Sequence, residues 1–72
     1  MNAEVRVWRL RKDHTWIDAR LRPCADSRDV EVQFFYDGAL LFGRRWPSRE
    51  LALTHADDQL RTLQRAGWNT HW

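Results

Sequence analysis

The dipeptide Asp37-Gly38 and the two runs beside it constrain the fold of this chain most. Residues 30–36 read VEVQFFY and residues 39–46 read ALLFGRRW, so apolar and polar side chains alternate on both sides of the dipeptide. Alternation with a period of two is typical of half-buried strands. Asp-Gly supplies the positive φ angles of a two-residue type I′ turn. The stretch therefore predicts an antiparallel hairpin.

A second hairpin is predicted nearer the N-terminus. Residues 4–11 (EVRVWRLR) and 16–22 (WIDARLR) also alternate, and the polar segment 12–15 (KDHT) joins them. Pro23 cannot donate to a strand ladder, so it ends the pairing and a loop follows over 23–29. That loop is long enough for the third strand to pair with either end of the first hairpin, and the strand order stays open.

The periodicity changes after Trp46 and predicts a helix. Ser48 is the expected N-cap, and Glu50 falls in the first turn, where the helix dipole favours an acid. Gly67 is the expected C′ residue, and Trp68 occupies the apolar position of a Schellman motif. An apolar stripe at helical spacing lies between these ends: Ala52, Ala56, Leu60 and Leu63, with Leu53 beside it.

These elements predict an α+β fold, a four-stranded antiparallel sheet of two hairpins with one C-terminal helix packed on one face. We expect a single compact domain over residues 1–72, with 68–72 either a loose tail or a segment folded over the sheet edge. A chain of 72 residues buries only about 60% of its unfolded surface. Cys24 is the single cysteine, so no internal disulfide compensates, and a partner subunit is expected.

Two-residue turns would also fix the two faces of the sheet. In that register Phe34 opposes Leu41 and Glu31 opposes Arg44, with Arg45 turned toward the helix. The face expected under the helix comprises Trp8, Leu10, Ile17, Ala19, Leu21, Val30, Val32, Phe34 and Leu41, with Arg6 at its end. The opposite face then carries Trp16, Phe35, Leu40, Phe42 and Trp46 among arginines.

The second face is more apolar than a solvated sheet face usually is, and apolar patches tend to mark interaction sites. Aromatic side chains and arginine are the residues enriched at protein interfaces. We therefore predict a non-catalytic module that presents this face to a protein partner, including a second copy of itself. The residues expected to make the contact are Trp16, Phe35, Phe42, Arg44 and Trp46.

Two other interpretations remain for the same face. Nucleic acid is the first, with arginines on phosphates and aromatic rings stacked on bases. Residues 5–22 hold six basic and two acidic side chains, although the formal charge of the chain is only +2. The arginines expected in that case are Arg9, Arg11, Arg20, Arg22 and Arg44. In the second interpretation Trp46, Trp68 and Trp72 fold over the sheet and complete a core that one helix cannot fill.

The sequence predicts no enzyme activity, cofactor, metal site or small-molecule substrate. His14, His55, His71 and Cys24 are scattered without ligand spacing, and His55 is expected on the solvated side of the helix. Asp57 and Asp58 lie about 100° apart on a helix and form no catalytic pair. No segment has the apolar length of a signal peptide or a membrane span, and the lone thiol suits a reducing compartment, so a cytoplasmic protein is expected.

Two resemblances accompany these patterns. Residues 36–68 resemble small uncharacterised bacterial proteins in which a hairpin precedes RxW, an Ala-spaced helix and a terminal GW. That likeness covers about half of the chain and implies no activity. More loosely, residues 46–52 (WPSRELA) are similar to the aromatic-x-Thr-x-x-Glu-Ala helix entry of AP2/integrase arm-type DNA-binding domains, with Leu51 interrupting the Glu-Ala pair. That likeness implies a sheet lying in a DNA groove with the helix behind it.

Overall fold

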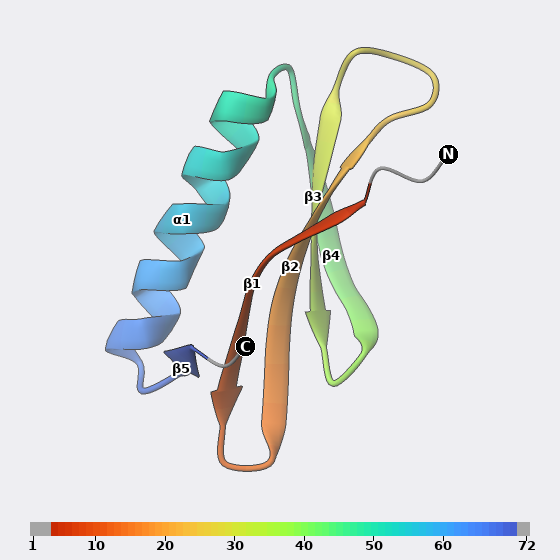
Figure 1. The fold of residues 1–72 in the computed structure, drawn as a ribbon. Helices are drawn as coiled ribbons and strands as arrows, with labels where there is room; N and C mark the ends of the chain where they lie inside the picture. The colour runs from red at the N-terminus through yellow and green to blue at the C-terminus, as the bar shows by residue number, and fades with distance from the viewer. Residues whose placement is uncertain (1–3, 71–72) are drawn as a thin grey trace.

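The computed structural model describes residues 4–70 and shows an α+β fold with an antiparallel sheet and one helix on one of its faces (Figure 1). The elements in chain order are β1 (Val5–Lys12), β2 (Thr15–Pro23), β3 (Val30–Tyr36), β4 (Ala39–Trp46), α1 (Arg49–Arg65) and β5 (Asn69–Thr70). The predicted α+β class and both hairpins are confirmed. The sheet has five strands, so the predicted count of four is wrong.

The strand order β4-β3-β2-β1-β5 settles what the sequence left open. The third strand pairs with β2, and β5 adds to the free side of β1 through Leu10 with Thr70 and Arg11 with Asn69. Part of the segment that could have been a loose tail is therefore a short strand. His71 and Trp72 lie outside the described residues.

Turn chemistry explains both hairpins. Asp37 and Gly38 have φ angles of 50° and 84°, as a type I′ turn requires. Asp13 in the first turn also has a positive φ, of 56°, which aspartate tolerates better than most residues. Next to each turn the pairing follows the prediction: Leu10 opposes Ile17, and Tyr36 opposes Ala39.

Farther from the turns, two β-bulges change the register. Val7 is an extra residue in β1, so Arg6 pairs with Arg20 and not with Leu21. Leu41 is an extra residue in β4, so Phe34 pairs with Phe42 and not with Leu41. Because side chains alternate between faces, each extra residue moves every position beyond it to the opposite face. Figure 1 shows the sharp bend of β1 in this region.

The helix begins and ends as predicted. The Ser48 hydroxyl accepts a hydrogen bond of 3.2 Å from the Leu51 amide, and Gly67 adopts a φ of 101°. The Trp68 amide donates to the Leu63 carbonyl over 3.0 Å, which completes the Schellman motif. Within residues 4–70 no helix is long and apolar enough to cross a membrane.

The core lies between α1 and the face of the sheet that it covers. Ala52 and Ala56 are fully buried, and their small side chains let the helix backbone approach the sheet. The Trp8 indole N–H donates to the Ala56 carbonyl over 2.8 Å and ties the middle of the helix to β1. The buried apolar cluster comprises Trp8, Leu10, Ile17, Ala19, Leu21, Val32, Phe34, Ala52 and Ala56.

Candidate functional site

The bulges divide the residues that were predicted to form one contact surface. Phe42, Arg44 and Trp46 pair with Phe34, Val32 and Val30, which all belong to the helix side of the sheet. Trp16 and Phe35 stay on the opposite side, which we call the outer face. The predicted placement of Phe42, Arg44 and Trp46 on the outer face, and of Arg6 and Arg45 on the helix side, is therefore wrong.

The outer face is a positively charged surface of the sheet. Its strands contribute six arginines and two acidic residues, and Glu4 lies beside Arg20 as a third acid. The arginines are Arg6, Arg9, Arg11, Arg20, Arg22 and Arg45. Four of the five arginines predicted for a nucleic-acid surface lie together here, and Arg44 does not. The net charge of this face exceeds that of the whole chain, so the remaining surface does not share the positive excess.

Asp18 is the one buried charged residue of the described chain, with 5% of its surface exposed. Its Oδ2 atom accepts a hydrogen bond of 2.8 Å from Arg20 Nε and lies 3.8 Å from Arg6 Nε. A carboxylate this buried requires such partners, because burial without them is expensive. The hydrogen bond to Asp18 is also the main reason why the pKa of Arg20 is raised above its usual value.

The aromatic rings of the outer face are covered by guanidinium groups. The guanidinium carbon of Arg9 lies 3.8 Å from the centre of the Trp16 ring, and that of Arg11 lies 4.9 Å away. Arg20 lies 4.2 Å from the centre of the Phe35 ring. These are cation–π distances. Arginine side chains therefore pack over Trp16 and Phe35 and form a layer on the outer face. The outer face is not the open apolar surface that the sequence predicted.

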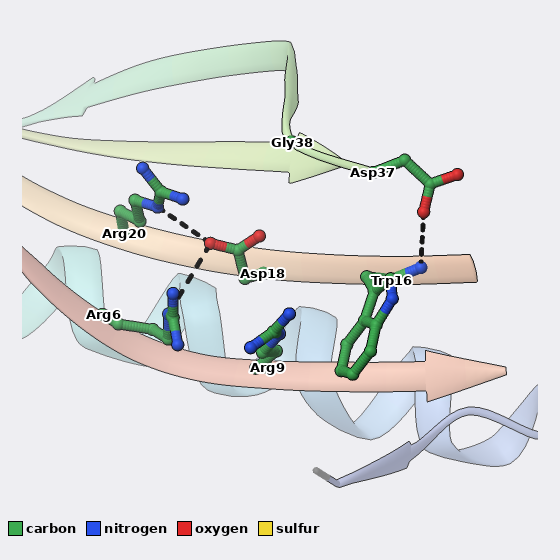
Figure 2. Close-up of a pocket in the computed structure, with 7 residues that line it drawn as sticks. All are labelled: Arg6, Arg9, Trp16, Asp18, Arg20, Asp37 and Gly38. Atoms are coloured by element: carbon green, nitrogen blue, oxygen red, sulfur yellow. Dashed lines mark hydrogen bonds and ion pairs between the residues drawn. The ribbon is translucent and has the colours of Figure 1, made fainter. Parts of the chain in front are cut away.

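An open hollow of about 300 Å³ lies in this layer. Figure 2 shows Asp18 between Arg6 and Arg20, with Arg9 and Trp16 along β1 and β2. The turn closes one end, because Asp37 Oδ1 accepts a hydrogen bond of 2.9 Å from the Trp16 amide. The lining residues are Arg6, Arg9, Trp16, Asp18, Arg20, Asp37 and Gly38. Sequence reasoning missed Arg6, although its position at the end of an apolar face was a sign of the bulge.

A second surface lies on the β3–β4 hairpin, which we call the hairpin patch and define as Tyr36, Leu40, Leu41 and Phe42. These side chains are exposed by 39%, 57%, 58% and 48% respectively. The bulge at Leu41 separates Leu40 and Phe42 onto different faces, so both sides of the edge strand carry apolar surface. Leu41 was expected in the core and is instead the most exposed member of the patch.

His55 and Trp46 meet between α1 and β4, with ring centres 4.9 Å apart. Trp46 Nε1 and His55 Nε2 are buried, and neither has a hydrogen-bond partner within residues 4–70. Burial is the main cause that lowers the pKa of His55, and the charge of Arg44 adds to it against the opposing effect of Asp58. The prediction that His55 lies on the solvated side of the helix is wrong.

Chemical groups for other activities do not converge in the described part of the chain. No set of three or more histidine, cysteine or acidic side chains there lies close enough to hold a metal ion. Cys24 is a buried free thiol whose amide donates to the Asp29 carbonyl over 3.0 Å. Asp57 pairs with Arg61 over 2.6 Å on the helix surface, as its spacing predicted.

The chain matches no protein-family model, no curated protein and no solved structure. The two resemblances noted in the sequence therefore stay predictions. Any functional conclusion depends on the outer face and on the hairpin patch.

Proposed function

We propose that this protein is a non-catalytic interaction module that binds a second copy of itself through the hairpin patch. The observation that carries this proposal is the run Leu40-Leu41-Phe42 on edge strand β4, where each side chain is about half exposed. Monomeric soluble proteins rarely expose contiguous apolar patches larger than a few hundred Å², and larger ones mark interaction sites. Of the five residues predicted for the contact, Phe42 belongs to this patch.

The charges beside the patch favour a second copy as the partner. Asp37 precedes the apolar run, and Arg44 and Arg45 follow it. Two hairpins lying antiparallel, with Leu41 at the centre, would bring Asp37 of each copy beside the arginines of the other. A parallel arrangement would bring like charges together. The segment is therefore complementary to itself in one orientation only, as a two-fold contact requires.

The same strand carries features that oppose unlimited edge-to-edge assembly. A bulge interrupts the regular edge at Leu41, and Arg44 and Arg45 place charge at its end. Natural sheets use bulges and edge charges to prevent aggregation. These features favour a closed dimer, held together by side chains, rather than a sheet that grows by adding further strands.

The dimer is expected to be weak. Four side chains supply only part of the roughly 800 Å² that each partner buries in a standard interface. We expect a dissociation constant that is roughly micromolar or weaker. Sedimentation velocity from about 1 μM to about 1 mM covers that range.

The informative variant is Leu41→Lys, because this exposed side chain can change without disturbing the core. Each copy would lose the burial of the exposed 58% of one leucine, about 1–2 kcal/mol, and a two-fold interface counts the loss twice. The dissociation constant should rise at least about thirtyfold. Leu53→Lys is the matched control, because Leu53 is 37% exposed on α1, and it should leave association unchanged. Equal association of both variants and the parent chain would refute the proposal.

The proposal includes neither catalysis nor a cofactor, and it places the protein in the cytoplasm. Five charged residues line an open hollow, whereas acid–base and nucleophilic catalysis depend on groups held where water is excluded. Cys24 is the single cysteine and its thiol is free. A free thiol persists best in a reducing compartment.

A further inference from the structure

The hollow of the outer face combines three groups that seldom occur together at one place on a surface. It holds the guanidinium group of Arg9, which no acid neutralises, the indole ring of Trp16, on which that guanidinium is stacked, and the buried carboxylate of Asp18, with one oxygen still available. Each group recognises a different part of a ligand, and together they select its chemical class.

The first of these groups is the positively charged guanidinium of Arg9. Asp18 is shared by Arg6 and Arg20, and Glu31 lies 3.3 Å from Arg22. The side chain of Arg9 forms neither an ion pair nor a hydrogen bond with another residue of the described range 4–70, and its guanidinium contacts the Trp16 ring. Its N–H groups are therefore free to bind an anionic oxygen, and guanidinium geometry suits phosphate.

The second group is the Trp16 indole, on which Arg9 is stacked. The indole holds the guanidinium 3.8 Å from its ring centre, so one face of the guanidinium plane is covered. Arg9 also lines the hollow, and Figure 2 shows Arg6 on the side of Arg9 away from Trp16. Nucleobases stack on guanidinium planes as they do on aromatic rings. A flat ring can therefore extend the stack that Trp16 begins.

The third group is Asp18. Both of its ion-pair contacts use Oδ2, and Oδ1 accepts no hydrogen bond from the residues that the structure describes. Figure 2 shows Oδ1 pointing away from Arg6 and Arg20, on the side of the hollow that Asp37 borders. A carboxylate oxygen accepts hydrogen bonds from base amino groups, of which the N4 amino group of cytosine is the usual partner.

We propose that the hollow between Arg9, Asp18 and Arg20 binds a nucleotide of single-stranded nucleic acid, with its base stacked on Arg9 and its phosphate on the arginines. The net positive charge of the outer face complements a polyanion, while the acceptor at Asp18 demands a ligand that also donates hydrogen bonds. A duplex keeps its bases stacked inside and cannot offer one to the hollow. Asp37 borders both this hollow and the proposed dimer contact, but Leu41 does not line the hollow, so substitutions at Leu41 and at Arg9 test the two proposals separately.

Fluorescence anisotropy with labelled oligonucleotides of equal length tests this site. Single-stranded oligo(dC), single-stranded oligo(dT) and a duplex are titrated with the protein at several salt concentrations. We expect oligo(dC) to bind about tenfold more tightly than oligo(dT), which lacks an exocyclic amino group. The duplex should bind more weakly than either. Affinity for single strands should fall with salt by a slope of about 0.7 for each phosphate bound.

The decisive variant is Arg9→Gln, which removes a guanidinium that no acid requires. It should weaken oligo(dC) binding about tenfold and lower the salt slope by about 0.7. Arg65→Gln is the matched control, because it removes the same charge from the exposed last turn of α1 and should have little effect. Thermal unfolding followed by circular dichroism shows that both variants are folded.

Several results would overturn the assignment. The first is the absence of binding at low salt, and the second is an equal loss in Arg9→Gln and Arg65→Gln. Competition by polyglutamate as strong as that by oligo(dC) would show a general polyanion surface without a base site. Equal affinity for oligo(dC) and oligo(dT) would show that Asp18 does not recognise the amino group of the base.

Discussion

Replacement by phenylalanine is expected to have different effects at Trp8, whose ring is buried, and at Trp46, whose ring is partly buried. Trp8 is 2% exposed and donates a hydrogen bond of 2.8 Å to the Ala56 carbonyl. Trp46 Nε1 is buried without a hydrogen-bond partner in the described residues. Replacing each in turn by phenylalanine therefore separates the contribution of the hydrogen bond from that of the apolar ring.

For Trp8→Phe two losses add. The hydrogen bond contributes about 0.5–1.5 kcal/mol. The smaller ring buries roughly 40 Å² less apolar surface, which at about 25 cal/mol per Å² is about 1 kcal/mol. The free energy of unfolding should fall by about 2 kcal/mol, from an expected total of about 4–11 kcal/mol for a domain of this length. The melting temperature should fall by about 8–16 °C.

For Trp46→Phe the balance differs. The ring is only partly buried, so the substitution removes less buried apolar surface than at Trp8. Removal of an unpaired buried N–H stabilises the folded state by about 1–3 kcal/mol. The free energy of unfolding should be unchanged or higher. Urea unfolding followed by circular dichroism at 222 nm measures both variants without depending on tryptophan fluorescence. A Trp46→Phe loss as large as that of Trp8→Phe would refute the hydrogen-bond assignments.

Two further predictions concern the helix. Burial lowers the pKa of His55 in the folded chain below its unfolded value near 6.5, so the unfolded state binds more protons and the free energy of unfolding should fall as the pH drops through 6.5. The difference between the urea midpoints at pH 5 and pH 8 should be smaller in His55→Gln than in the parent chain. An unchanged difference would exclude His55 as the cause. Ser48→Ala removes the hydroxyl that accepts a hydrogen bond from the Leu51 amide and should lower the free energy of unfolding by about 1 kcal/mol. A loss below about 0.2 kcal/mol, well under the range for N-caps, would contradict the assignment of Ser48 as the N-cap.

The two hairpins and the helix could be predicted because each has a local chemical cause, whereas the unpredicted strand β5 is defined by its pairing with β1. Asp37-Gly38 fixes a turn, Ser48 and Gly67 bound the helix, and the alternation in each strand shows which positions share a face near the turn. These signals act over a few residues, and the structure agrees with them over that range.

The faces of Arg6, Phe42, Arg44, Arg45 and Trp46 could not be predicted, because one extra residue reverses every side chain beyond it. Neither Val7 nor Leu41 is a glycine or otherwise typical of a bulge, so no single position announced the change. The indirect sign was a conflict of polarity, with Arg6 on the expected core face and Trp46 on the expected solvent face. A bulge in each hairpin removes both conflicts, since Arg6 then joins the outer face and Trp46 packs against the core.

The two aromatic residues that do lie on the outer face, Trp16 and Phe35, have a different role from the predicted one. Trp16 and Phe35 lie under Arg9 and Arg20, so they orient charges and offer little open apolar area. The hairpin patch supplies the apolar area instead. Charge and apolar surface thus occupy different parts of the sheet, and two interactions of different chemistry are proposed for them.

The most direct test of the proposed self-association is residue-resolved. Amide chemical shifts of the ¹⁵N-labelled protein are recorded at increasing concentration. We predict concentration-dependent shifts at Tyr36, Leu40, Leu41 and Phe42, with smaller shifts at the flanking Asp37 and Arg45. Shifts confined to α1 or to the outer face around Trp16, or no shifts over the whole range, would contradict the account.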